Sequence, residues 1–194
     1  MQSSESVTTR LVRRVVLDGA RELPPAAAEA TRTFVLDSLG VALSGTRVPM
    51  VRELATIAVE WGRGDAARVW GTGERVPAAT AAFLNGYQIH NQEWDCVHEP
   101  AVVHPMAVVL STLLAYADAR GGIDGRRFMR ACSTAVDVAA SIGCAARNKL
   151  RFFRPAMCGA LGATAGLAQL NGCDEATTRS ALGLAYSQLS GTMQ

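Results

Sequence analysis

Apolar stripes at helical spacing follow one another along this chain, and prolines and glycines separate one stripe from the next. Pro24 and Pro25 precede a segment that runs to Gly45, and Pro105 and Pro155 stand before two further apolar segments. Proline suits the first turn of a helix and disrupts a helix interior. The repeated pattern predicts an all-α fold, a bundle-like domain with about seven or eight helices.

Besides a predicted loop at residues 148–154, two segments of the chain depart from this helical spacing. Residues 67–77 combine a short extended piece with the turn sequence Gly71-Thr72-Gly73, which predicts at most one short hairpin. Residues 90–103 are polar and aromatic without clear periodicity, which predicts a loop. We expect helices at residues 7–20, 24–45, 50–61, 78–88, 105–119, 125–146, 155–170 and 174–189.

The composition excludes several classes of protein. Hydrophobic residues make up 49% of the chain, which excludes wholesale disorder. No run approaches the roughly 20 apolar residues of a membrane span, and residues 1–14 lack the features of a signal peptide. The net charge is only +2, with basic residues scattered among acids. We therefore expect a cytoplasmic protein with neither a membrane nor a nucleic-acid partner.

The cysteines and glycines do not predict a bound metal or cofactor. Five cysteines are present, an odd number, and none forms a Cys-x-x-Cys pair. A disulfide framework or a structural zinc site is therefore not expected. Gly71-Thr72-Gly73 lacks the further glycine of a dinucleotide-binding fingerprint, and no strand–helix–strand pattern surrounds it.

All three histidines of the chain lie in one 15-residue window that also contains several acids. His90, His98 and His104 share this window with Glu93 and Asp95. Histidine titrates near neutral pH, and a carboxylate held against it fixes its tautomer and raises its basicity. Acids and imidazoles on a loop between two apolar helices indicate a candidate functional site.

Three interpretations of this window remain open on the sequence. The first is acid–base catalysis. The second is metal binding by His90, Glu93, His98 and His104, although their spacing matches no standard metal-binding template. The third is structural, with loop side chains bonded to helix ends. Cys96, beside these residues, is a further candidate as a nucleophile, but no other motif supports covalent chemistry.

A second candidate site lies at Arg151-Phe152-Phe153-Arg154-Pro155. Pro155 suits the first turn of a helix, and arginine beside the free N–H groups of a helix start can bind a small carboxylate. The alternative is a surface arginine next to two core phenylalanines.

Several motifs together resemble the N-terminal helical domain of the MmgE/PrpD superfamily, which includes 2-methylcitrate dehydratase and cis-aconitate decarboxylase. The resemblance covers almost the whole chain, and its most specific part is His104-Pro105 with the acidic stretch before it. The matching segments are Leu36-Asp37-Ser38-Leu39-Gly40, Ala82-Phe83-Leu84-Asn85-Gly86, His90, His104-Pro105, Gly159-Ala160-Leu161-Gly162 and Ala181-Leu182-Gly183-Leu184-Ala185.

The resemblance implies that residues 1–194 form the helical, N-terminal part of a longer two-domain protein. Family members carry a second α+β domain, and a lysine and a tyrosine that complete their active site would lie beyond Gln194. It also implies a cofactor-independent lyase, usually a homodimer, that acts on a small polycarboxylate. As partners we therefore expect that substrate and either a second copy of the chain or a C-terminal domain.

Two positions depart from the family pattern. The family's D-F-D-D cluster reads Glu93-Trp94-Asp95-Cys96, and Phe153 stands where the family's F-H-P block has a histidine. These changes imply a sub-branch with a different substrate or a different proton donor.

The resemblance and the residues together assign candidate roles. We expect Asp95 and His104 to belong to a proton-transfer site, with Glu93 and His98 as further catalytic candidates. Arg154 would hold a substrate carboxylate, and Asn91 would orient the loop or a carboxylate.

The reaction expected from these roles is removal of a proton next to a carboxylate, followed by loss of water or carbon dioxide. Epimerisation or isomerisation of a dicarboxylate needs the same first step and stays open. The alternative from another class is a non-catalytic helical module for oligomerisation or partner binding, or a truncated, inactive fragment.

Overall fold

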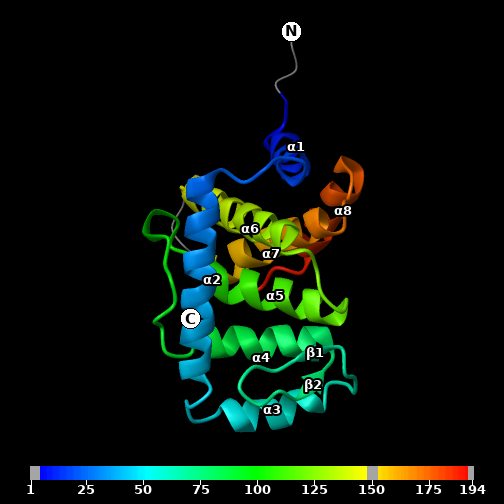
Figure 1. Cartoon of the computed structure of the whole chain (residues 1–194). Coiled ribbons are helices and arrows are strands. Elements are labelled where there is room, and N and C mark those ends of the chain that lie inside the picture. Colours follow the sequence, from blue (N-terminus) through cyan, green and yellow to red (C-terminus); the bar gives the residue numbers. More distant parts are fainter. Residues whose placement is uncertain (1–4, 148–152, 192–194) are drawn as a thin grey trace.

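The computed structural model describes residues 5–147 and 153–191, and these are mostly helical (Figure 1). The helices in this part of the chain are α1 (Val7–Gly19), α2 (Pro25–Gly45), α3 (Val51–Val59), α4 (Ala78–His90), α5 (Pro105–Ala119), α6 (Gly125–Ala145), α7 (Arg154–Leu170) and α8 (Glu175–Ser187). A 3₁₀ turn, η1, spans Glu99–Ala101, and β1 (Ala67–Arg68) pairs antiparallel with β2 (Arg75–Val76). The predicted all-α class with one short hairpin is confirmed.

Short polar side chains and prolines begin most of these helices. Ser6, Asp124 and Asp174 each accept a backbone N–H from the first turn of α1, α6 and α8, respectively. Such caps satisfy N–H groups that have no partner within the helix. Prolines stand in the first turn of α2, α5 and α7. These start signals explain why the helices begin within two residues of the expected positions.

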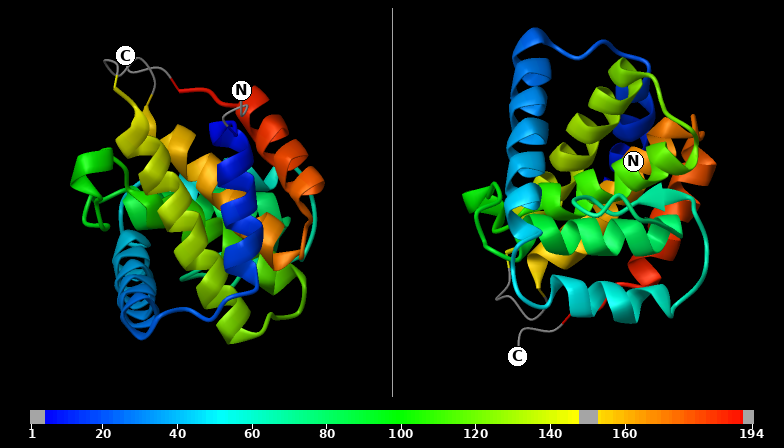
Figure 2. Two further views of the ribbon diagram at one scale, coloured as in Figure 1. Left: turned by 90° about the horizontal axis from the view of Figure 1, so that it is seen from above. Right: turned by 60° about the horizontal axis from the view of Figure 1, so that its bottom comes forward.

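The helices form a stack that α2 crosses (Figure 1). From one end of the stack to the other run α3, α4, α5 and then the pair α6 and α7, while α2 packs against α4, α5 and α6. The views in Figure 2 place α1 and α8 side by side at the far end, where they contact each other. The helix pair α4–α5 therefore lies in the middle of the stack. Helix α2 packs against both of them, and α7 packs against α5.

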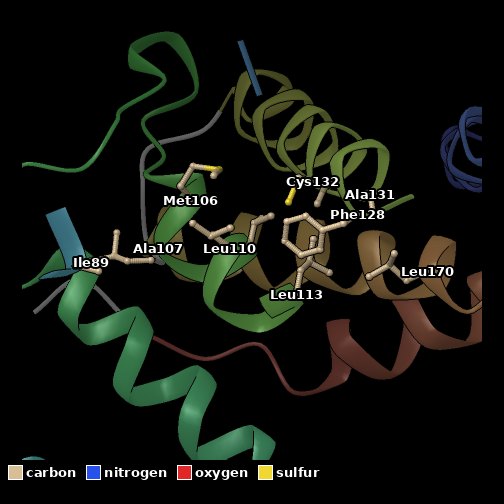
Figure 3. Packing of buried hydrophobic residues seen from close by; sticks show 12 residues of the cluster. Ile89, Met106, Ala107, Leu110, Leu113, Phe128, Ala131, Cys132 and Leu170 are labelled. Atoms are coloured by element: carbon tan, nitrogen blue, oxygen red, sulfur yellow. The ribbon is translucent and has the colours of Figure 1, made fainter. Parts of the chain in front are cut away.

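The largest hydrophobic cluster centres on α5 (Figure 3). Met106, Leu110 and Leu113 of α5 are almost fully buried against Phe128 and Cys132 of α6. Aliphatic and aromatic side chains removed from water supply the main stabilising free energy of such a core. None of the helices in the described part of the chain is long and apolar enough to cross a membrane.

Glycines allow the backbones to approach closely where α7 meets α6 and where α2 meets α4. A Cβ atom added at Gly162 would lie 2.4 Å from the carbonyl oxygen of Ala135, and one added at Gly45 would lie 2.0 Å from that of Gln88. Neither position has room for a side chain, so glycine sets the distance between these helices.

The hairpin is held against α4 by the buried Asn85 and against α5 by the half-buried Asp118. The Asn85 side chain accepts the Trp70 N–H at 2.9 Å and donates to the Arg68 carbonyl at 2.9 Å. Asp118 of α5 accepts the Arg68 N–H at 2.8 Å and lies 3.5 Å from the Arg75 guanidinium. These bonds satisfy hairpin backbone groups that the two-residue ladder leaves unpaired.

The structure differs from the sequence expectation in the segment before α5. Helix α4 continues to His90, two residues beyond the expected end, and the following loop contains the turn η1. Glu93 and Val102 in this loop adopt positive φ values of 55°. Left-handed backbone is uncommon for these residue types, so the sequence gives no signal for it.

Candidate functional site

The last residue of α4 and the residue before α5 lie next to each other. The ring centroids of His90 and His104 are 4.9 Å apart. The intervening loop leaves α4 and turns back through an isolated bridge between His98 and Val103. This return delivers His104 to the start of α5, beside His90.

Asp95 lies between the two histidines and is the centre of the site. Its side chain has no solvent exposure, and its Oδ1 lies 2.9 Å from Nδ1 of His90 and 3.4 Å from Nδ1 of His104. The first contact is a hydrogen bond, whereas the second is not aligned for one. A buried carboxylate requires partners of this kind because isolation from water disfavours its charge.

The electrostatics of the cluster favour a protonated His90. The hydrogen bond to Asp95 raises the pKa of His90 above its usual value near 6.5, and the charges of Asp95 and Glu93 act in the same direction against the effect of burial. Oδ2 of Asp95 and Nδ1 of His104 are both buried without a hydrogen-bond partner. The cluster therefore retains one acceptor and one imidazole nitrogen for further bonding.

A cavity of about 420 Å³ opens beside the two histidines, between α4, α5 and the start of α7. Its lining comprises Ala82, Phe83, Gly86, Tyr87, His90, Asn91, His104, Ala107, Val108, Ser111, Thr112, Phe153, Pro155 and Ala156. Its volume lies in the range of small-molecule sites, and it combines apolar walls with a few convergent polar groups.

Two of the other candidate residues lie close to this cluster. Asn91 lines the cavity, donates to the Gly45 carbonyl at 3.0 Å and has a buried Oδ1 without a partner. Glu93 is 79% exposed, and its carboxylate lies 4.0 Å from Nε2 of His90. Both residues are therefore within reach of a molecule bound at the histidines.

The structure does not bring His98 or Arg154 into this cavity. Nδ1 of His98 accepts the Ala101 N–H at 3.2 Å, and the residue lines a different cavity beneath α2. The Arg154 guanidinium donates to the carbonyls of Ala101 and Ala146, both at 3.3 Å. These bonds hold the loop and the end of α6 together. Arg151 and Phe152 of the predicted anion site lie outside the described residues.

The remaining part of the second candidate site contributes to the cavity in a different way. Phe153 and Pro155 line it as an apolar wall at the start of α7. The helix start therefore borders the cavity, although its described arginine is bonded elsewhere.

Cys96 is poorly suited to act as a nucleophile. Burial and the nearby Asp95 raise the pKa of its thiol to about 11. The thiolate is the reactive form, so this cysteine is inert near neutral pH.

His90, Asp95 and His104 also form a set of potential metal ligands. One ligand atom from each lies within 4.8 Å of the others. Two imidazoles and a carboxylate match the donor preferences of several divalent transition metals. The cluster can thus act either as an acid–base group or as a ligand set.

His90 belongs to this cluster, although the sequence reasoning left it out of the expected catalytic set. Its position carries a signal: Phe83, Gly86, Tyr87 and His90 fall on one face of a helix at spacings of three and four. The signal depends on α4 continuing to residue 90, two residues beyond the expected end.

Comparison with known proteins gives relatives that are named cis-aconitate decarboxylases. The chain is 28% identical to the cis-aconitate decarboxylase of Mus musculus over 81% of this chain and 34% of that protein. It is 27% identical to the Homo sapiens protein of the same name over 85% of this chain and 36% of that protein, and 28% identical to that of Aspergillus terreus over 89% and 37%. The chain thus spans about a third of the length of these curated relatives.

The match to a family description covers nearly all of the chain. The chain matches the MmgE/PrpD N-terminal domain over residues 10–194. This protein therefore belongs to the MmgE/PrpD family.

Proposed function

We propose that this chain supplies the acid–base part of a lyase site that removes a proton next to a carboxylate of a small polycarboxylate. The observation that carries the proposal is the fully buried Asp95 carboxylate, held within 3.4 Å of two histidines at the wall of a cavity. The decarboxylase names of the relatives support the same reaction class.

In this proposal Asp95 and His104 form the proton-transfer pair. A small rotation of the His104 ring aligns its Nδ1–H with Asp95, which leaves the other ring nitrogen free to accept a proton. The substrate C–H bond breaks, its electron pair passes to the adjacent carboxylate, and the proton moves to His104. For dehydration the imidazolium then protonates the departing hydroxyl. For decarboxylation the proton first returns to a neighbouring carbon. The C–C bond to the lost carboxylate then breaks, its electron pair stays on the carbon skeleton, and a second proton, taken from water through His104, is added to that carbon.

The other candidate residues receive supporting roles in this proposal. His90 is a positioning residue, because its bond to Asp95 fixes the orientation of that carboxylate. Asn91 lines the cavity, is held by its bond to the Gly45 carbonyl, and orients the substrate. Glu93 adds a second carboxylate next to His90. His98 and Arg154 keep the loop in place through their backbone contacts.

We make two further proposals, one on the oligomeric state and location of the enzyme and one on its need for a cofactor. We propose that the working enzyme is a homo-oligomer in the cytoplasm, since large apolar side chains such as Trp61 and Trp94 are exposed on this chain. We also propose that the reaction needs no cofactor. The ligand set at His90 favours a metal-binding function as the second candidate.

The test follows deuterium incorporation by proton NMR, with cis-aconitate, citrate and methyl-substituted analogues in D₂O. Exchange or product formation is expected with the unaltered protein. His104→Ala and Asp95→Asn should each lower the rate by about 10²–10⁴-fold. Glu53→Gln, at an exposed carboxylate of α3 that does not line this cavity, is the control and should keep the rate, and circular dichroism verifies the fold of each variant.

Three results would count against this function. A folded protein without exchange on any acid would leave the non-catalytic helical module as the better account. Activity lost with a chelator and restored by a divalent metal would favour the metal site. Exchange that inverts the substrate carbon without loss of water or carbon dioxide would identify an epimerase.

A further inference from the structure

A further cavity, of about 400 Å³, lies where the connection between α1 and α2, the first turns of α2 and the start of α6 meet. The left view of Figure 2 shows this connection passing beside the start of α6. The cavity shares no lining residue with the one at His90 and His104. It is therefore a separate space from the candidate lyase site.

Three arginines from two helices line this cavity. Arg126 and Arg130 stand four residues apart on α6 and so lie on one face of that helix, and Arg32 comes from α2. The lining contains one acid, Glu22, from the connection before α2. Three guanidinium groups and one carboxylate give the cavity a positive charge.

The chain itself makes little use of these guanidinium groups. Among the described residues, Arg126 and Arg130 have no hydrogen-bond or ion-pair partner for their side chains, whereas Arg127 between them donates to the Leu170 carbonyl at 2.7 Å. Arg32 pairs with the carboxylate of its α2 neighbour, which is 72% exposed. Exposed pairs of this kind contribute little, so the donors of all three arginines remain available to a ligand.

A neighbouring cavity that shares Glu22 has the opposite balance of charge. Two arginines, Arg14 and Arg21, line it together with three acids, Asp18, Glu22 and Asp137. Arg14 and Asp18 also form an ion pair. The positive charges of that cavity are neutralised within the chain. The arginines on α6 instead repel each other, and an anion bound between them would relieve this repulsion.

The arrangement of the arginines favours phosphate over carboxylate groups. A phosphoryl group carries about two negative charges at pH 7 and offers three acceptor oxygens, so donors from two helices can bind it together. Guanidinium groups bind phosphate through paired hydrogen bonds. Arg126 and Arg130 are separated by about 6 Å along the axis of α6, a spacing that suits two linked phosphoryl groups.

We propose that this cavity binds a small molecule that carries a diphosphate group. The two phosphoryl groups lie among Arg32, Arg126 and Arg130, and the group attached to them contacts the apolar side chains of Leu23 and Met129. This inference does not depend on the proposed lyase function, because it uses none of the residues of that site.

The test is isothermal titration calorimetry of the unaltered chain at constant ionic strength. The probes are pyrophosphate, adenosine diphosphate, inorganic phosphate and tricarballylate, which has three carboxylates. Pyrophosphate and adenosine diphosphate should each bind about tenfold or more tightly than inorganic phosphate, because the second phosphoryl group adds charge-assisted hydrogen bonds. Tighter binding of adenosine diphosphate than of pyrophosphate would indicate that the attached group contacts the apolar part of the cavity.

Two variants locate the bound diphosphate. Arg126→Gln and Arg130→Gln should each weaken pyrophosphate binding by about tenfold or more, because each removes a charged donor. Arg52→Gln, at an exposed position of α3 away from this cavity, removes the same charge and should leave binding unchanged. Thermal unfolding without ligand should show no loss of stability in Arg126→Gln or Arg130→Gln, since each substitution reduces the repulsion on α6.

Three results would overturn this inference. The first is the absence of a heat of binding with both diphosphates. The second is an equal loss of affinity in Arg52→Gln, which would indicate attraction to the overall charge of the chain. The third is tricarballylate binding that is as tight as pyrophosphate binding and as sensitive to Arg126→Gln, which would indicate a general anion site. Deuterium exchange is not part of this test, so failure of the lyase function would leave the inference standing.

Discussion

Asp95 is buried because two histidines from different parts of the chain approach it. His90 bonds one carboxylate oxygen at 2.9 Å, and His104 lies 3.4 Å from the same atom. Burying a carboxylate away from water is costly unless a hydrogen-bond donor is close. The same contact that makes Asp95 a candidate for catalysis therefore stabilises its burial.

We predict that the pKa of His90 depends on Asp95. Nuclear magnetic resonance of the ring protons should give His90 a pKa above 6.5, and Asp95→Asn should bring it down, because the hydrogen bond to Asp95 is its largest cause. His98, exposed and bonded to a backbone N–H, provides the reference signal. An unchanged His90 titration in Asp95→Asn would contradict the geometry of the cluster.

The same shift predicts how the His90–Asp95 contact depends on pH. A histidine whose pKa is raised by folding adds stability that is fully present below its unfolded pKa and is lost as the pH rises through the folded pKa. His90→Gln should therefore reduce the free energy of unfolding more at pH 5.5 than at pH 8.5. Urea unfolding at the two pH values measures this, and an equal loss at both would contradict it.

The helices of this protein depend on close contacts that particular residues permit. The backbone of α7 approaches α6 at Gly162 so closely that a Cβ atom would lie 2.4 Å from the Ala135 carbonyl oxygen. We predict that Gly162→Ala lowers the free energy of unfolding by about 1–3 kcal/mol, because one of the helices must shift. Thermal unfolding followed by circular dichroism measures the change.

Gly183 provides the matched control for that substitution. It lies in α8 with nothing within 4 Å of an added Cβ. Gly183→Ala should therefore raise the stability by up to about 1 kcal/mol through helix propensity. If both alanine substitutions were stabilising, the close approach of α6 and α7 would be wrong.

The hairpin depends on two buried amides of α4, Asn85 and Gln88, and Gln88 donates to the Trp70 carbonyl at 3.1 Å. Asn85 satisfies the Trp70 N–H and the Arg68 carbonyl and has no solvent exposure. We predict that Asn85→Ala lowers the free energy of unfolding by about 1–3 kcal/mol, because both backbone groups lose their partner. Amide hydrogen exchange at Trp70 should rise in the variant. Thr72→Ala, in the turn of the same hairpin, should have a much smaller effect.

At the scale of the whole molecule, many large apolar side chains lie exposed on the surface of the described residues. Leu36, Trp61, Trp94, Leu184 and Tyr186 are each more than half exposed. Large exposed apolar surface drives association. We predict that this chain self-associates, with a sedimentation coefficient that rises with concentration. Leu36→Gln should weaken the association, whereas a monomer at every concentration would contradict the prediction.

Most of the helical architecture was predictable because its signals are local. Pro25, Pro105 and Pro155 lie in the first turns of three helices, and Asp174 caps α8. Each signal acts through backbone geometry or a hydrogen bond within one turn. The predicted end of α4 was two residues too early, because no residue after Gln88 signals where the helix ends.

The sequence by itself determined the helical class, the helix starts and the segment in which acids and histidines gather, because those depend on neighbours along the chain. Only the tertiary structure decided which of those side chains meet. Positive φ values at Glu93 and Val102 and the bridge from His98 to Val103 turn the loop back. That path places His90 and His104 around Asp95, while His98 and Arg154 bond to backbone atoms elsewhere. Spacing along a loop without a regular period does not encode such distances, because they depend on how α4, α5 and α7 pack.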